Sequence, residues 1–172
     1  MIHTSDVKLT ILGKPMGKQR PKFSNIGRFV KAYTPKQTIN YESQVVAEYK
    51  ANYKEPMFKV NDEIRAIITA YFKIPKANYH FHKKTQTTDL DVEGELMLQG
   101  KLKPMKAPDV DNIAKICLDA LNGIAYPDDC QITCLHVEKY YSEEPRVEIS
   151  LQRVWKPIVR KGRKNGKRKE TI

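Results

Sequence analysis

"PDVDNIAKICLDALNGIAYPDD", residues 108–129, decides the fold, because it reads as one short helix with aspartates at both ends. Its apolar positions recur at helical spacing and form a single stripe: Ile113, Ile116, Cys117, Ala120 and Leu121. Asn122-Gly123 is a typical helix stop, so the pattern predicts a helix from Asp109 or Val110 to Leu121. The stretch holds five aspartates and one lysine, although the formal net charge of the chain is +11.

The segments on either side carry strand and helix patterns that together indicate the fold class. Alternating apolar residues predict strands over residues 7–13, 62–74, 131–142 and 145–155, and helical spacing predicts a helix over 38–53. Residues 14–36 read as a basic loop or hairpin, and 75–107 as an insertion with a short helix between 83 and 98. This order predicts one α+β domain over residues 1–155, a small mixed β-sheet with two main helices packed on it.

The composition points to a polyanionic partner. The 31 Lys and Arg residues outnumber the 20 Asp and Glu residues, which favours nucleic acid. No apolar run approaches the roughly 18 residues of a membrane span. The first residues lack the pattern of a signal peptide, so we expect a cytoplasmic protein.

The cysteines are three in number, Cys117, Cys130 and Cys134. An odd number in a reducing compartment argues against disulfides. Cys130 and Cys134 raise the alternative of a zinc site, but no second Cys or His pair completes it at zinc-finger spacing. Buried thiols are the preferred interpretation.

The aspartates have a structural and a functional interpretation. Taken separately, Asp109 and Asp111 are typical of a helix cap, and Asp128-Asp129 of a turn before a strand. Taken together, they offer the carboxylate oxygens that a hard divalent cation such as Mg²⁺ requires. The second interpretation needs the loop after the helix to fold back and carry Asp129 towards the helix start.

Lys115 lies one helical turn after Asp111 and also has two interpretations. It forms an ordinary ion pair at i,i+4 spacing, or it is a cation beside a metal site, directed at a phosphate. Asp119 continues the same helix face and is expected to pair with Lys115 rather than to bind metal.

The motif as a whole resembles the signature of the RusA family of Holliday junction resolvases. The shared features are an Asp-x-Asp-Asn-x-x-Lys helix, a following Asp-Ala-Leu and an Asp-Asp before a strand, all present in "PDVDNIAKICLDALNGIAYPDDCQI". The N-terminal "GKPMGKQRPKF" and "GRFVKAYTPKQTINYE" also resemble the basic loop and first helix of prophage-type members. The two matches cover about a third of the chain.

This resemblance implies an endodeoxyribonuclease that resolves four-way DNA junctions in recombination and repair, acting as a homodimer with Mg²⁺, for which Mn²⁺ is a possible substitute. Carried over, the acidic metal site falls on Asp109, Asp111 and Asp129, with Asp128 as a further candidate and Lys115 as the essential lysine. The basic frame that holds the DNA phosphates is expected at Lys14, Lys18, Arg20, Lys22, Arg28 and Lys31.

Two other functions stay open at this point. The first is a non-catalytic, basic nucleic-acid-binding protein whose aspartates are caps and turn residues. The second is a metal-dependent nuclease that acts on flaps or RNA rather than on junctions. Cleavage that requires Mg²⁺ separates the first alternative from an enzyme, and competition between substrates separates the second.

The C-terminal segment 156–172 is expected to be a disordered basic tail, with eight Lys and Arg residues from Lys156 to Lys169. Deleting it should weaken DNA binding and flatten the dependence of affinity on salt, because each neutralised phosphate releases condensed counterions. Cleavage at low salt should survive the deletion. Titrations of full-length and truncated protein at several salt concentrations test this, and an unchanged salt slope would assign the tail another role.

Overall fold

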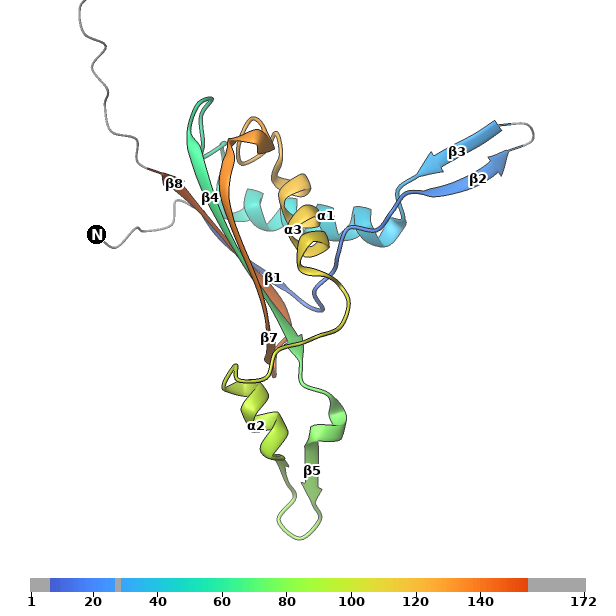
Figure 1. The fold of residues 1–172 in the computed structure, drawn as a ribbon, viewed down its shortest axis with the longest axis vertical. Helices are drawn as coiled ribbons and strands as arrows, with labels where there is room; N and C mark the ends of the chain where they lie inside the picture. Colours follow the sequence, from blue (N-terminus) through green and yellow to red (C-terminus); the bar gives the residue numbers. More distant parts are fainter. Residues whose placement is uncertain (1–6, 27–28, 155–172) are drawn as a thin grey trace, which may run out of the picture.

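A four-stranded mixed sheet with two helices on one face forms the body of the protein (Figure 1). The structure is a computed structural model that describes residues 7–26 and 29–154. Its elements are β1 (Val7–Leu12), β2 (Lys22–Ile26), β3 (Phe29–Tyr33), α1 (Lys36–Asn52), β4 (Glu63–Lys73), the 3-10 turn η1 (Lys76–Asn78), β5 (Tyr79–His82), β6 (Thr87–Leu90), α2 (Val92–Leu98), α3 (Val110–Leu121), the 3-10 turn η2 (Asp129–Gln131), β7 (Ile132–Ser142) and β8 (Arg146–Val154). The predicted α+β class is confirmed.

The sheet has the strand order β1-β8-β4-β7. β8 pairs with β1 and β4 in antiparallel fashion, whereas β4 and β7 are parallel. Parallel neighbours need a crossover connection, which here runs through the insertion and then α3. A crossover helix must run back along the sheet, so α3 is antiparallel to β7.

The core lies between the sheet and the two helices. Alternate residues of β4 point into it and are fully buried, among them Ile64, Ile68 and Phe72, while Arg65 and Lys73 are exposed. The predicted apolar stripe of α3 is buried in full. Burial raises the pKa of the Cys117 thiol in this stripe to about 12, so it stays protonated.

The turn after α3 is held firmly at the C-terminal end of that helix. The buried Tyr126 hydroxyl donates to the Leu118 carbonyl at 2.8 Å, and the Phe58 amide donates to the Ala125 carbonyl at 3.1 Å. Gln131 donates to the carbonyls of Lys59 and Asp62, at the start of β4. These bonds tie the segment between α3 and β7 to the N-terminal end of β4.

The opposite end of β7 holds the entry to α3. The Lys139 ammonium donates to the backbone carbonyls of Lys106 and Pro108, at 2.6 and 3.2 Å. Lys103 pairs with Glu138 at 2.8 Å and, with hydrogen bonds from neighbouring side chains, lowers the pKa of that carboxyl to about 2. The chain is therefore fixed on the sheet immediately before α3 begins.

The insertion is a small unit of its own below the sheet in Figure 1. The hairpin of β5 and β6 leads into α2, whose first turn is capped by Asp91 through a 2.6 Å bond from the Gly94 amide. The predicted helix between residues 83 and 98 is thus confined to α2, because a β-hairpin occupies the first part of that range. A Cβ at Gly94 would lie 2.9 Å from the end of the Leu90 side chain, so any larger residue there would require Leu90 to shift.

The basic segment 14–36 contains a hairpin, as one of the two sequence interpretations predicts. β2 and β3 form a two-stranded ribbon that projects away from the body (Figure 1). None of the described helices is long and apolar enough to cross a membrane. The predicted tail 156–172 and Arg28 lie outside the described residues.

Candidate functional site

The N-terminal end of α3 carries two aspartates that the fold does not use for capping. Asp109 occupies the N-cap position, yet its side chain forms no cap hydrogen bond, and only its carbonyl accepts the Ile113 amide at 3.0 Å. Asp111 lies in the first turn, and both side chains are exposed. The capping interpretation is therefore wrong for Asp109, and two carboxylates are presented to solvent at a helix N-terminus.

The second acidic pair divides into a structural and an exposed residue. Asp128 accepts from the Cys130 amide at 2.9 Å, while its own amide donates to Gln131, which completes a capping box for η2. The bond from the Cys130 amide helps to lower the pKa of Asp128. Asp129 begins η2 and is exposed. The turn interpretation thus describes Asp128, and Asp129 is the better metal-ligand candidate of the two.

The two acidic pairs lie at opposite ends of α3. Lys139 of β7 contacts Pro108 at the helix start, whereas the loop before η2 is bonded to the last turn of α3. The helix has 12 residues and is roughly 18 Å long. The expectation that Asp129 folds back to Asp109 and Asp111 within one chain is therefore wrong. In the described part of the chain, no three Asp, Glu, His or Cys side chains are grouped to hold a metal ion.

Lys115 is exposed on α3, and none of the ion pairs formed by the described residues includes it. The predicted pairing of Asp119 with Lys115 is wrong, because Asp119 binds Lys18 at 2.9 Å instead. The ordinary structural role of Lys115, an i,i+4 ion pair, is thus absent from this structure. Its ammonium group is presented to solvent one turn beyond Asp111.

Lys18 links three segments of the chain. Its ammonium group contacts both Glu42 of α1 and Asp119 of α3, and all three side chains are at least 71% buried. Partial burial opposes the charged form, but the hydrogen bonds that the ammonium donates to Glu42 and Asp119 outweigh it and raise the pKa of Lys18. Lys18 therefore joins the basic segment to both helices, and its charge is neutralised by protein carboxylates.

The contact between the basic segment and α3 is also close at the backbone. The Lys18 amide donates to the Asn112 carbonyl at 2.8 Å. A side chain at Gly17 would approach Pro108 to 2.8 Å and Asn112 to 3.0 Å, so only glycine permits this spacing without a shift.

An open cleft of about 730 Å³ lies beside Asp109. It is bounded by the basic segment, the first half of α1 and the start of α3, and five amide side chains are among its walls. Its lining residues are Lys14, Pro15, Met16, Gly17, Lys18, Gln19, Gln37, Asn40, Tyr41, Gln44, Ala107, Pro108, Asp109 and Asn112. The cleft thus places Lys14 and one candidate ligand on the same hollow surface.

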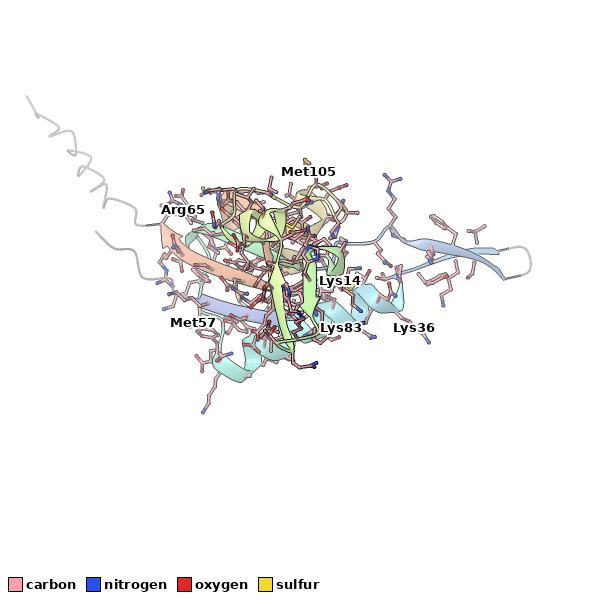
Figure 2. The ribbon with its side chains drawn as sticks, turned by 90° about the horizontal axis from the view of Figure 1, so that it is seen from below. Lys14, Lys36, Met57, Arg65, Lys83 and Met105 are labelled. Carbon is pink, nitrogen blue, oxygen red and sulfur yellow. The ribbon has the colours of Figure 1, made fainter. Side chains whose placement is uncertain are left out.

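Three further predicted phosphate contacts, Arg20, Lys22 and Lys31, are exposed. Arg20 follows the cleft, and Lys22 and Lys31 lie on the ribbon of β2 and β3. Figure 2 shows Lys14 near the body and the ribbon extending beyond Lys36.

Sequence reasoning missed two residues that shape the site. Glu42 lies in the predicted first helix, but its pairing with Lys18 has no counterpart in the sequence pattern. Gly17 lies in the predicted basic loop or hairpin, where glycine is common without any such contact. Neither contact is local in sequence, so periodicity carries no signal for them.

Comparison with known proteins supplies a family match over most of the chain. A family model described as Endodeoxyribonuclease RusA matches residues 13–152, which include the basic segment, both helices and all the candidate acidic residues. Among curated proteins, the uncharacterized protein YqaN of Bacillus subtilis strain 168 is 32% identical over 148 residues. The aligned region covers 86% of this chain and 96% of YqaN.

Replacing Lys18 by methionine should destabilise the protein by about 1–3 kcal/mol, because Glu42 and Asp119 would face each other without a cation while still largely buried. Lys14→Met is the matched control, since Lys14 is exposed and the described residues form no ion pair with it. Urea denaturation of the two variants measures the difference. Equal free energies of unfolding would show that Lys18 does not hold the segments together.

Proposed function

This chain belongs to the RusA endodeoxyribonuclease family, and on that premise we propose that it resolves four-way DNA junctions by Mg²⁺-dependent, symmetric hydrolysis of two phosphodiester bonds. The observation that carries the proposal is the pair of exposed, uncapped carboxylates at the start of α3, beside a basic segment. We place the reaction in recombination and repair, in the cytoplasm.

The donor set fits a hard cation in part. Asp109 and Asp111 supply carboxylate oxygens of the kind that Mg²⁺ or Mn²⁺ prefers, and Asp129 is the third proposed ligand. When bound, the metal supplies Lewis-acid chemistry that activates water and stabilises charge on the phosphate. Within one chain, the length of α3 separates Asp129 from Asp109 and Asp111. A second chain is therefore needed to complete the set of three ligands.

A homodimer meets this requirement. Two α3 helices packed side by side in opposite directions, about a two-fold axis, place the N-terminal end of one beside the η2 turn of the other. The surface near α3 carries apolar side chains available for such a contact: Val110 is 45% exposed, and Leu135 of β7 is 47% exposed. Two equivalent sites then match two symmetric cuts in a junction.

The chain's own cations have separate tasks in this proposal. Lys115 donates hydrogen bonds to the phosphate oxygens on which negative charge develops, and its place beside Asp111 keeps it next to the metal ligands. Lys14, Arg20, Lys22 and Lys31 bind the flanking phosphates, and Arg28 is assigned the same task from its sequence. Lys18 orients the basic segment through its two ion pairs.

The main test is cleavage of a synthetic four-way junction with Mg²⁺ or with EDTA. Asp111→Asn should lower the Mg²⁺-dependent rate by orders of magnitude, because it removes a ligand charge, while junction binding persists or tightens. Asp89→Asn, on the exposed β5–β6 hairpin, is the control and should cleave normally. Cleavage by Asp111→Asn at the wild-type rate would refute the proposed metal site.

The same assay separates the alternatives. A non-catalytic binding protein leaves the junction intact with or without Mg²⁺. A flap or RNA nuclease cleaves those substrates in preference to the junction when they compete in one tube.

The shared site predicts complementation between two inactive variants. When Asp111→Asn and Asp129→Asn chains are unfolded and refolded together, the mixed dimer should contain one site with all its ligands and should cut a single strand of the junction. A mixture of Asp109→Asn and Asp111→Asn chains is the control, since both losses fall on one helix end and no intact site forms.

Strand-specific labelling of the junction reads out this result. Recovery in the first mixture alone supports a site built from two chains. A first mixture as inactive as its parents would place all three ligands in one chain, after a rearrangement of the loop before β7.

A further inference from the structure

The ribbon of β2 and β3 has two chemically different faces. Opposite residues of an antiparallel pair point to the same side, so the register places Phe23, Ala32 and Val30 on one face. Lys22, Ser24, Lys31 and Tyr33 lie on the other. Among the ribbon residues whose side chains the structure describes, one face is thus apolar, and the other carries two lysines, a serine and a tyrosine.

The apolar face is not covered by the body of the protein. Phe23 is 70% exposed and Val30 is 67% exposed, and both views show the ribbon standing away from the helices and the sheet (Figures 1 and 2). An isolated two-stranded ribbon is only marginally stable in water. A large aromatic side chain held at such a position gains stability mainly from a partner.

We propose that the ribbon enters the open centre of branched DNA, where Phe23 stacks on a base at the branch point while Lys22 and Lys31 contact the phosphates. This inference rests on the proposed function and deepens it, since it assigns the recognition of branched over linear DNA to one face of one hairpin.

Charge and shape favour DNA as the occupant over another protein. The basic face lies directly behind the apolar one, and the chain as a whole carries a net charge of +11. A two-stranded ribbon has the width that a DNA groove admits, and apolar side chains that contact DNA commonly insert between base steps. DNA is the partner that offers flat apolar base faces and anionic phosphates within the span of one ribbon.

The same contact explains selectivity for a branch. Separating a stacked base pair in linear duplex costs free energy, whereas bases next to a strand exchange are already partly unstacked. Phe23 therefore contributes affinity at the branch point and little on a continuous duplex. Lys22 and Lys31 contribute equally to both, because phosphates are common to every arm.

The experiment compares Phe23→Ala with Phe81→Ala as a matched control. Phe81 is 58% exposed and lies on β5, in the other projecting hairpin, so both changes remove one exposed aromatic ring. Each protein is titrated in EDTA, so that no strand is cut, against a four-way junction and a linear duplex of the same sequence. The junction carries 2-aminopurine at the branch point, whose fluorescence rises when that base leaves its neighbours.

We expect Phe23→Ala to bind the junction about tenfold more weakly and to lose the fluorescence rise, with less than a twofold change on duplex. Phe81→Ala should match the wild type in all three readouts, and both variants should keep the wild-type melting temperature. Lys31→Met should weaken binding to junction and duplex alike.

The outcomes separate this inference from the proposed function. Wild-type protein that leaves the junction uncut in Mg²⁺ would refute the proposed function itself, whereas wild-type protein that binds junction and duplex equally would overturn this inference. If the wild type prefers the junction and Phe23→Ala binds it with the same affinity and fluorescence rise, only the role of the ribbon is overturned. An equal loss of affinity for junction and duplex in Phe23→Ala would also overturn the ribbon's role. A loss of dimerisation in this variant, measured by sedimentation, would do the same, because it would make the apolar face a protein contact.

Discussion

The parallel pairing of β4 with β7 is the constraint on which the rest of the structure depends. Parallel neighbours cannot be joined by a tight turn, so the chain crosses back through α3 before β7 begins. A helix that returns in this way begins near the C-terminal ends of β4 and β7 and ends near their N-terminal ends. Asp109 and Asp129 are consequently separated by the length of the helix, whatever their chemical similarity.

The lysines of the basic segment differ in burial, and this difference decides which of them are available to a ligand. Lys18 is held between Glu42 and Asp119 in the interior of the site, where a cation without partners would be costly. Lys14, Lys22 and Lys31 are exposed and free to meet phosphates. The count of 31 Lys and Arg residues therefore overstates the cations available to DNA, because Lys18 attaches the basic segment to the helices instead.

The core and the two projecting hairpins differ in how much apolar surface they bury. The core is a continuous apolar cluster to which β1, β4 and β8 contribute alternate residues, so substitutions there act on stability. The ribbon of β2 and β3 and the hairpin of β5 and β6 bury little and display their side chains to solvent. Binding residues are commonly found on exposed elements of this kind, because the rigid core holds these elements in place.

The sequence alone predicted the helices and strands of the main body and a chemistry for the site. Periodicity predicted α3 to within a residue, because the apolar stripe, the aspartates before it and Asn122-Gly123 after it all indicate one helix. The strands of the main sheet and the basic hairpin are likewise local in origin. Motif spacing was sufficient to identify the family and to propose Asp109, Asp111 and Lys115 as site residues.

Only the tertiary structure decided which of these residues meet. Strand order is set by packing over the whole sheet, and it determines that Asp129 lies far from Asp109 within one chain. The partner of Asp119 is Lys18 rather than Lys115, because the fit at Gly17 brings the basic segment against α3. A local pattern fixes which face of an element a side chain occupies, but what that face contacts depends on segments distant in sequence.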